Sequence, residues 1–558
     1  MQRKLLSFLI CICCARLSAQ VPFSTMDSVN INNINAAVLV HGDLWWNPTT
    51  EVAHCEFPNG SQKNISFAGA LWMSGYDGAG LLHVAAQTYR QTGNDFWPGP
   101  LDSSDTLTYA ISQSWAKIWK VNRSDIQLFQ ALTVHDTINT PVDILTWPAV
   151  GNTYARGNGG APLTLYPGNT YAPFVDLNGD GIYEPLEGEY PDVPGDQALW
   201  WVFSDNGPAH TQTNGRPLGV EIHAMAYAYS RGTLIDNVVY YDYHIINHSA
   251  NTYDNFRLGQ WADMEIGYYY NDYIGFDSSH RMGICYKGDT CSTCFATTDN
   301  PYGNKPPVVG ISMVVLPGDV PPTYIPAGSF DYYNNDNSVI GNPSVDTEYD
   351  HYLRSKIKDG KHFKDDFFGP GIECNGYDSG LNTNYVFTGD PGNDTTWSEC
   401  TCGNPPGDRR IVLASNDITL LPSSTNDFVL ALITTNLDSL NGCPDVSFDS
   451  IKIVADTAWA IYYNPLPPVP AAVNNVAAVN TISVYPDPAH NELYITDTRP
   501  QGGAISVTVY NTVGQLMNIA TNYSNNNSVL DVSQLVPGMY YIVYRNGNKQ
   551  QYAKFVKE

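Results

Sequence analysis

Hydrophobic and polar residues alternate in short runs along most of the chain, a pattern typical of strands. Residues 218–230 and 238–247 are two tyrosine-rich runs that a short Arg-Gly-Thr turn at 231–233 joins, and they predict a β-hairpin. The apolar runs 310–316 and 428–434 have the length of buried strands. The chain contains 46 glycines, 37 prolines and 37 tyrosines, which favours turns and aromatic strands over long helices.

Two stretches have the pattern of helices. Ser124 and Gln127 fit a capping box that opens a short helix. A second stretch spaces its apolar residues at i, i+3, i+4, i+7 and i+11, as one face of an amphipathic helix requires. These residues are Ile451, Val454, Ala455, Ala458 and Tyr462. We therefore expect a mainly β body, residues 20–463, with a few helices.

The end of the chain has the pattern of a separate domain. Residues 464–480 carry no charge and are rich in Pro, Ala and Asn, which predicts a linker. Residues 481–558 contain short alternating strands separated by Gly, Pro and Asn turns, a pattern typical of a small β-sandwich. The expected strands are 482–485, 492–495, 504–510, 539–545 and 551–556. The fold class is therefore mainly β and multidomain.

The first 19 residues have the features of a secretory signal peptide. Arg3 and Lys4 precede an apolar run from Leu5 to Ala15, and small residues follow at the cleavage point. The run is too short to span a bilayer, and no later stretch reaches the length of a transmembrane helix. We expect the mature chain to start at Gln20 and to have no transmembrane segment.

Composition narrows the classes of partner. The 558 residues are 43% hydrophobic, enough for a large core, and only 15% charged. The formal charge is −27, and it becomes −30 when the signal peptide removes Arg3, Lys4 and Arg16. Residues 481–558 are neutral, so the excess charge belongs to the body. A chain of this charge is a poor partner for nucleic acid or anionic lipid.

The tail carries five ordered sequence blocks. They are Val484-Tyr485-Pro486-Asp487-Pro488, Leu493-Tyr494-Ile495, Val509-Tyr510-Asn511-Thr512-Val513-Gly514, Leu535-Val536-Pro537-Gly538-Met539-Tyr540 and Lys554-Phe555-Val556-Lys557. The tail resembles the type A C-terminal sorting domain of the type IX secretion system of the Bacteroidota, with Asp487 where Asn is usual. The resemblance implies recognition by that machinery, passage through the periplasm, and a secreted or cell-surface location.

Eight cysteines remain after the signal peptide. An even number in an exported protein predicts disulfides. The candidates are Cys55, Cys285, Cys291, Cys294, Cys374, Cys400, Cys402 and Cys443. The pair Cys291 and Cys294 also has the spacing of half a zinc site or a redox pair, but a second half with matching spacing is missing. The pairing is left open by the sequence.

Residues 176–187 fit a twelve-residue calcium loop. Oxygen ligands at its first, third and fifth positions converge because a glycine at the sixth, Gly181, allows a sharp turn. The predicted Ca²⁺ ligands are Asp176, Asn178, Asp180, the Ile182 carbonyl, Glu184 and Glu187. Pro185 disfavours the usual exiting helix, so we expect a structural calcium site rather than a two-helix sensor. An acidic surface turn is the alternative.

A second acidic group has less regular spacing. It contains Asp263, Glu265, Asp272 and Asp277, and the sequence leaves open whether these form a metal site or solvated turns. His244 lacks a nearby carboxylate spacing that would complete a metal site. The tryptophan pairs 45–46 and 200–201 suit aromatic core packing better than sugar stacking.

The body also carries familiar blocks, among them Gly69-Ala70-Leu71-Trp72, Asp95-Phe96-Trp97-Pro98-Gly99, Gly259-Gln260-Trp261-Ala262-Asp263 and Gly407-Asp408-Arg409-Arg410. Their order resembles a group of large secreted Bacteroidota proteins that carry sorting domains and have no assigned activity. The resemblance implies one integrated body and supplies no catalytic residues.

Two functions fit these observations. The first is a non-catalytic secreted or cell-surface binding or structural protein, braced by calcium and disulfides, with an extracellular glycan or surface partner. The second is an extracellular hydrolase that acts on glycans through paired carboxylates. The motifs HExxH, GxSxG and the P-loop are absent from the sequence. A pocket with two suitably separated carboxylates would favour the hydrolase.

Overall fold

The computed structural model describes the chain in segments. They are residues 24–89, 93–165, 170–289, 301–436, 442–468, 482–497, 505–511, 515–523, 527–546 and 549–558. The predicted signal peptide, Cys291, Cys294 and most of the predicted linker lie outside these segments. The chain divides into two compact units, residues 1–470 and 471–558.

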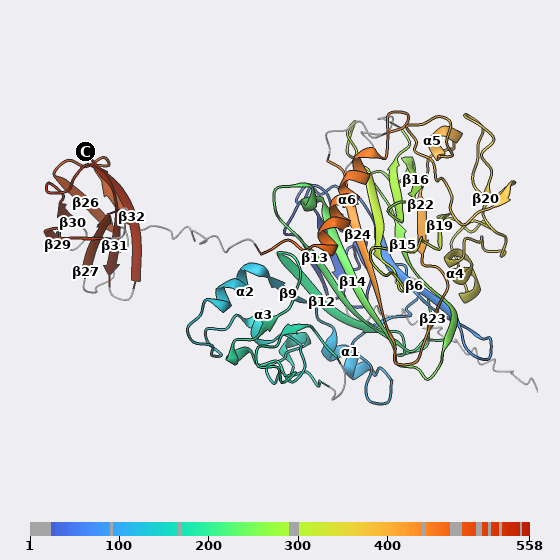
Figure 1. The fold of residues 1–558 in the computed structure, drawn as a ribbon, viewed down its shortest axis with the longest axis horizontal. Helices are drawn as coiled ribbons and strands as arrows, with labels where there is room; N and C mark the ends of the chain where they lie inside the picture. The colour runs from blue at the N-terminus through green and yellow to red at the C-terminus, as the bar shows by residue number, and fades with distance from the viewer. Residues whose placement is uncertain are drawn as a thin grey trace, which may run out of the picture. The chain divides into compact units, whose positions relative to one another are not determined.

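The larger unit is built on a nine-stranded antiparallel sheet (Figure 1). Its strands, in spatial order, are β16 (Asp272–Asp277), β17 (Met282–Lys287), β18 (Val309–Val315), β24 (Thr425–Thr434), β14 (Val238–Asn247), β13 (Val220–Ala228), β12 (Gln197–Ser204) and β8 (Trp97–Pro98), with β9 (Trp119–Asn122) also on β12. Strands β13 and β14 pair antiparallel as predicted, with the 3₁₀ helix η3 (Leu234–Asn237) in their connection. The predicted strands at 310–316 and 428–434 are β18 and β24, which are direct neighbours.

A second antiparallel sheet has six strands. In order they are β19 (Ser329–Asn334), β22 (Arg409–Ala414), β15 (Tyr253–Asp263), β6 (Ala68–Tyr76) and β7 (Leu82–Ala86), with β23 (Ile418–Leu420) also on β15. The described residues of this unit also form smaller sheets. They are β1 (Met26–Val29), β2 (Asn35–Leu39) and β5 (Cys55–Glu56); β3 (Trp46–Asn47) and β4 (Val52–Ala53); β10 (Phe174–Val175) and β11 (Tyr190–Pro191); and β20 (Lys364–Asp365) and β21 (Leu381–Asn382).

The two large sheets share one hydrophobic core, to which Trp72 and Trp261 contribute from the six-stranded sheet and Trp201 and Tyr241 from the nine-stranded one. A second core covers the opposite face of the nine-stranded sheet. Because both faces are covered, β12 and β13 are buried along their whole length rather than at alternate positions. The tryptophan pairs 45–46 and 200–201 are buried, as the core-packing interpretation predicted.

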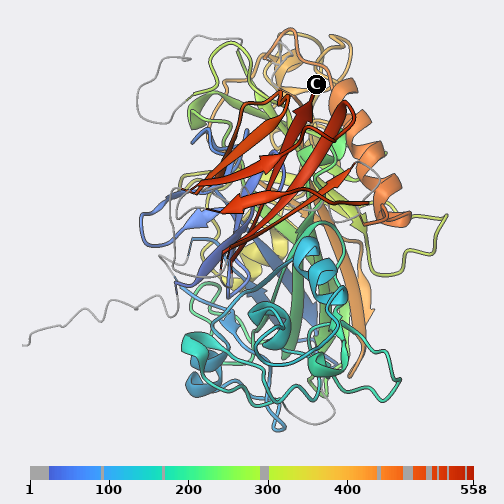
Figure 2. The same ribbon diagram turned by 90° about the vertical axis from the view of Figure 1, so that its left-hand side faces the viewer.

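The helices pack against strands of the two large sheets. They are α1 (Tyr109–Trp115), α2 (Arg123–Gln130), α3 (Val142–Leu145), α4 (Asp346–Leu353), α5 (Glu399–Cys402) and α6 (Asp449–Tyr463), with 3₁₀ helices η1 (Asn158–Gly160), η2 (Pro185–Glu187) and η4 (Tyr269–Asn271). The segment from α1 to α3 lies at one end of this unit in both views (Figures 1 and 2). No helix among the described residues is long and apolar enough to cross a membrane.

One helix prediction is confirmed in full and the other in part. In α6 the predicted face, including Ile451, Val454 and Ala458, is buried against the second core. Helix α2 forms where the capping box predicted a helix, but its N-cap is Asn122, so the capping box was wrong. Ser124 already lies in the first turn because the helix begins directly after strand β9.

The smaller unit contains two four-stranded antiparallel sheets, which confirms the predicted small β-sandwich. One sheet has the order β25 (Ile482–Tyr485), β26 (Glu492–Asp497), β30 (Asn527–Asp531), β29 (Thr521–Tyr523), and the other β28 (Leu516–Met517), β27 (Ile505–Asn511), β31 (Gly538–Asn546), β32 (Lys549–Lys557). Leu493, Ile542 and Phe555 are among the residues that fill a common core. All five predicted strands are present; β28, β29 and β30 were not predicted.

Disulfides cross-link the segment between β19 and β22 and join it to the chain before α6. Cys374 bonds to Cys402, and Cys400 bonds to Cys443, so α5 carries one cysteine of each bond. Cys55 and Cys285 are buried free thiols, and here the structure differs from the predicted disulfide set. Both lie in the hydrophobic core shared by the two large sheets, where burial raises the pKa of each thiol.

Candidate functional site

A cavity of about 630 Å³ opens at the end of the six-stranded sheet. Its walls are mainly tyrosine, amide and charged side chains. The lining residues are Phe67, Thr88, Tyr89, Gln212, Asp263, Glu265, Tyr269, Tyr333, Asn335, Asn337, Asn342, Pro343, Tyr349, Asp408 and Arg410. A mixture of aromatic faces with converging polar groups is typical of a ligand-binding pocket.

Strand register brings the floor of the pocket together. Asp263 on β15 pairs with Arg410 on β22, and Arg410 pairs in turn with Tyr333 on β19. Residues directly opposite each other in antiparallel strands point to the same face of a sheet. These three side chains therefore form one row across three strands, although 147 residues separate the first two in sequence.

Among the described residues of the pocket lining, Arg410 is the one basic residue, and it holds the floor by hydrogen bonds. Its Nη2 donates to Oδ2 of Asp263 at 2.9 Å, its Nε donates to the hydroxyl of Tyr89 at 3.0 Å, and it also forms an ion pair with Asp408. The Tyr89 hydroxyl donates to the same Asp263 oxygen at 2.5 Å. The second carboxylate oxygen of Asp263, Oδ1, is buried without a hydrogen-bond partner.

Three carboxylates crowd into this floor. Asp263, Glu265 and Asp408 each place an oxygen within 4.8 Å of the other two, and among the described residues this is the one acidic, histidine or cysteine group of that closeness. Burial, and then repulsion from Asp263 and Asp408, raise the pKa of Glu265 to about 10. Burial also raises the pKa of Asp263 to about 6, although Arg410 opposes this shift. Carboxylates this close share a proton or a cation.

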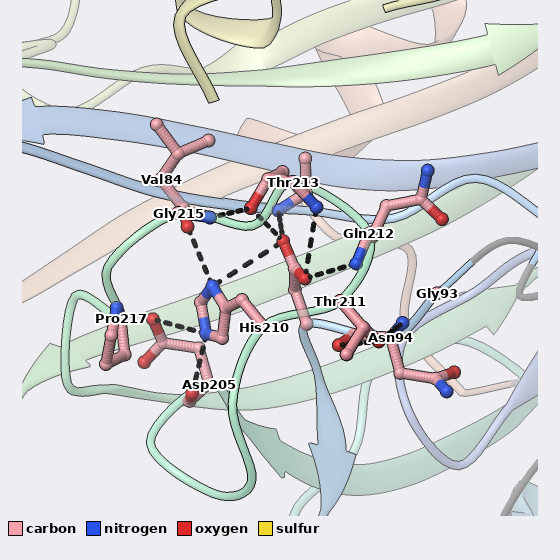
Figure 3. Close-up of polar contacts among 12 residues, drawn as sticks. Val84, Gly93, Asn94, Asp205, His210, Thr211, Gln212, Thr213, Gly215 and Pro217 are labelled. Carbon is pink, nitrogen blue, oxygen red and sulfur yellow. Dashed lines mark hydrogen bonds and ion pairs between the residues drawn. The ribbon is translucent and has the colours of Figure 1, made fainter. Parts of the chain in front are cut away.

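A buried polar network positions one wall of the pocket (Figure 3). Ring nitrogens of His210 contact the carbonyl oxygens of Val84 at 2.8 Å and Asp205 at 2.9 Å. The Asp95 carboxylate accepts from the backbone N–H of Gln212 at 3.0 Å and from the Thr213 hydroxyl at 2.7 Å. These bonds fix the backbone at Gln212, which lines the pocket.

Gln212 in turn orders a neighbouring aromatic residue. Its side-chain amide donates to the hydroxyl of Tyr349 on α4 at 2.6 Å. Tyr349 also lines the pocket, and its ring packs edge-on against Trp72 with 4.7 Å between centroids. The wall is therefore tied to the hydrophobic core and is preorganised for a ligand.

Aromatic and amide side chains form the rim of the pocket. Tyr269 lines the cavity, and its ring centroid lies 4.1 Å from that of Tyr270, which is 55% exposed. The side chains of Asn335 and Asn337, in the turn after β19, are exposed. A planar aromatic surface beside amide groups suits contact with the faces and hydroxyls of a sugar ring.

The predicted calcium loop folds as a turn at the surface. Asp176 accepts hydrogen bonds from the backbone N–H groups of Gly179 at 2.7 Å and Gly181 at 2.8 Å, and Asp180 accepts from Ile182 at 2.8 Å. Gly181 has a φ of +77°, the left-handed conformation that the motif needs. The pKa of Asp176 is lowered, with the bond from Gly181 as the largest cause.

The remaining predicted ligands of the loop lie in less regular backbone. The Glu184 carboxylate accepts from the Asn178 side chain at 3.1 Å, and Glu187 ends the short 3₁₀ helix η2. Within the described residues, the loop's acidic side chains do not converge as the pocket triad does. Calcium binding at residues 176–187 stays a prediction.

The structure divides the second acidic group. Asp263 and Glu265 meet Asp408 in the pocket, whereas Asp272 forms an ion pair with Lys287 at 2.9 Å and Asp277 one with His280 at 2.6 Å. Asp272 and Asp277 therefore lie outside the triad. His244 does have a carboxylate partner: Asp427 on the neighbouring strand lies 2.6 Å from its Nδ1, a contact that only strand pairing creates.

Asp408 and Arg410 are the functional candidates that the sequence reasoning missed. The available signal was the Gly407-Asp408-Arg409-Arg410 block, an acidic residue followed by two arginines at the start of a strand. Its partner, Asp263, is fixed only by the register of β15 and β22.

Comparisons with known proteins identify the tail. Residues 483–558 match the family described as the secretion system C-terminal sorting domain. This match confirms the predicted type IX sorting domain, and it indicates that the protein is secreted or attached to the cell surface. No curated protein matches the chain by sequence.

A solved structure described as a polysaccharide lyase resembles the chain at 9% sequence identity with a TM-score of 0.18. The match covers 60% of this chain and 34% of that structure, so the chain spans about a third of its length. A TM-score this low carries no conclusion about the body.

Proposed function

We propose that the protein is a non-catalytic extracellular binding protein whose pocket takes a saccharide. The observation that carries the proposal is the lining of the 630 Å³ cavity, where tyrosine faces, three asparagines and a glutamine surround a charged floor. Saccharides offer both hydroxyl groups and flat C–H faces, and this lining supplies partners for each. Export by a sorting domain places such a pocket where glycans occur.

The arrangement of the carboxylates favours binding over hydrolysis. A glycosidase needs two carboxyl groups on opposite sides of the scissile bond, about 5–5.5 Å apart in retaining enzymes and about 6.5–9.5 Å apart in inverting ones. Here Asp263 and Asp408 both form ion pairs with Arg410. Together with Glu265 they form one cluster in which each residue places an oxygen within 4.8 Å of the other two, below both of these separations.

Calcium bound at residues 176–187 would brace the body in this proposal. Asp176, Asn178, Asp180, the Ile182 carbonyl, Glu184 and Glu187 would supply oxygen ligands, which Ca²⁺ prefers. The left-handed backbone at Gly181 supports the assignment. A loop closed over the ion would hold η2 and β11 against the segment from α1 to α3.

Affinity electrophoresis of the purified chain through gels that contain single polysaccharides tests the binding role. We expect retardation by at least one polysaccharide, and we expect the exposed-residue variants Asn335→Ala and Asn337→Ala and the rim variant Tyr269→Ala to reduce it. Tyr109→Ala is a matched control because Tyr109 is 64% exposed on α1, outside the pocket. Retardation that all pocket variants keep would contradict the proposal, and release of new reducing ends would assign a glycan-cleaving enzyme instead.

A further inference from the structure

We propose that Asp263, Glu265 and Asp408 bind a divalent cation, most suitably Ca²⁺, on the floor of the pocket. Asp263 ends β15, Glu265 lies two residues beyond that end, and Asp408 lies directly before β22; each places an oxygen within 4.8 Å of the others. This site is separate in sequence from the predicted loop at residues 176–187.

A buried carboxylate oxygen of Asp263 that has no hydrogen-bond partner supports the cation site. Asp263 is only 1% exposed, and its Oδ1 has no hydrogen-bond partner, while its Oδ2 accepts from both Tyr89 and Arg410. A buried carboxylate oxygen without a hydrogen-bond partner is unfavourable, and native proteins seldom leave one in place. A cation would satisfy this oxygen.

The other two carboxylates also keep oxygens for a ligand. Asp408 uses Oδ1 in its contact with Arg410, and its Oδ2 accepts only a 3.2 Å hydrogen bond from the exposed Asn335 side chain. Glu265 makes no hydrogen bond or ion pair with other described residues. The triad therefore offers three possible ligand atoms. They are Oδ1 of Asp263, a carboxyl oxygen of Glu265 and the weakly held Oδ2 of Asp408.

Charge balance supports the same occupant. Three carboxylates share one guanidinium, an excess of two negative charges when all three are ionised. A divalent ion neutralises this excess, and an all-oxygen ligand set selects hard cations such as Ca²⁺ over softer metals. Three protein ligands leave coordination positions for water or for ligand hydroxyls in the cavity, an extension that rests on the proposed saccharide function.

Calcium titration calorimetry on the full chain tests the site. All variants carry Asp180→Ala, which removes a central ligand of the 176–187 loop, so that the pocket is measured alone. Glu265→Gln and Asp408→Asn remove charge with little change of shape. Asp254→Asn is the matched control, since Asp254 is exposed on the same strand outside the pocket. Near-ultraviolet circular dichroism in chelator checks that each variant is folded.

We expect saturable binding of one Ca²⁺ in the Asp180→Ala background, at least tenfold weaker binding in Glu265→Gln and Asp408→Asn, and no change in Asp254→Asn. Absence of saturable binding up to about 10 mM, above the range of weak extracellular sites, would overturn the proposal. Binding that Glu265→Gln leaves unchanged would overturn it too. Calcium binding without polysaccharide retention would refute the saccharide proposal and leave the cation site standing.

Discussion

Asp263 and Arg410 lie directly opposite each other on strands β15 and β22, and an ion pair of 2.9 Å joins their side chains at the floor of the pocket. Both are almost completely buried, at 1% and 4% exposure. The contact fixes the end of β15, and with it the neighbouring Glu265, relative to β22, the strand that Asp408 directly precedes.

The buried ion pair predicts that single and double substitutions differ strongly in their effect on the free energy of unfolding. Arg410→Gln leaves Asp263 buried without a cationic partner, and loss of one member of a buried pair costs about 3–5 kcal/mol. Asp263→Asn combined with Arg410→Gln removes both charges, so we expect the double variant to recover part of that loss. Urea unfolding at neutral pH measures the free energy of unfolding of the single and double variants. Strict additivity of the two single effects would contradict the predicted coupling.

Calcium should stabilise the body through the loop at residues 176–187. Binding to the folded loop alone adds about 2.7 kcal/mol at a hundredfold excess of Ca²⁺ over its dissociation constant. We therefore expect chelation to lower the melting temperature and to increase proteolysis near residues 172–195. Thermal melting in millimolar calcium and in chelator measures the shift.

One loop variant and one double variant of loop and pocket separate this effect from the pocket. Asp180→Ala should reproduce the loss of stability in calcium, and any remaining response to chelator should then disappear in the Asp180→Ala, Glu265→Gln double variant. Identical melting curves of the wild type with calcium and with chelator would remove the structural calcium claim.

Export depends on the tail in this account. Deletion of residues 481–558 removes the sorting domain. Because a signal peptide directs transport across the inner membrane alone, we expect the body to accumulate in the periplasm. Cell fractionation and immunoblotting check the location. Full surface or medium levels of the truncated protein would refute the sorting role, while a mature C-terminus near residues 464–485 would agree with removal of the tail.

The cysteines should divide into two chemical classes. Cys374 and Cys402, and Cys400 and Cys443, should appear as disulfide-linked peptides in mass spectrometry under non-reducing conditions. Cys55 and Cys285 should resist alkylation until the protein unfolds, because burial excludes the reagent and raises the pKa of each thiol. Rapid alkylation of either in the native protein would contradict their placement.

His280 predicts a pH-dependent contact between the β16–β17 turn and α6. Burial opposes a charge on its ring, but hydrogen bonds to Asp277 at 2.6 Å and Asp456 at 2.9 Å outweigh burial and raise its pKa above 6.5. A raised folded-state pKa gives stability that is complete below the unfolded value and is lost as pH rises through the folded value. The stability advantage of wild type over His280→Gln should therefore stay constant below about pH 6.5 and shrink as the pH rises above it, which urea unfolding measures. Growth of that advantage with rising pH would contradict the prediction.

Local patterns predicted the elements that depend on local spacing. Helix α6 follows from five apolar positions on one face, and the β13–β14 hairpin follows from two long runs with a short turn between them. The capping box at Ser124 was wrong because strand β9 extends to Asn122 and the helix begins directly after it. Ser124 therefore already lies in the first helical turn.

The pocket could be predicted only in part, since its residues meet through long-range register. Asp263 and Glu265 stood out as a local acidic pair, yet their partner, Asp408, lies directly before another strand, β22, and is one of many acidic residues in the body. Periodicity assigns a residue to a face of a strand, but it does not say which strands are neighbours. Asp272 and Asp277 lie closer to Asp263 in sequence, but they form ion pairs with Lys287 and His280 instead.

Hydrogen–deuterium exchange with the retained polysaccharide, cut to short oligosaccharides, tests the binding claim most directly. The account predicts slower exchange in the segments around Tyr269 and in residues 335–343, which line the rim, with little change on α1. Protection confined to other parts of the body, or none at a concentration that saturates binding, would contradict the assignment of this pocket as the binding site.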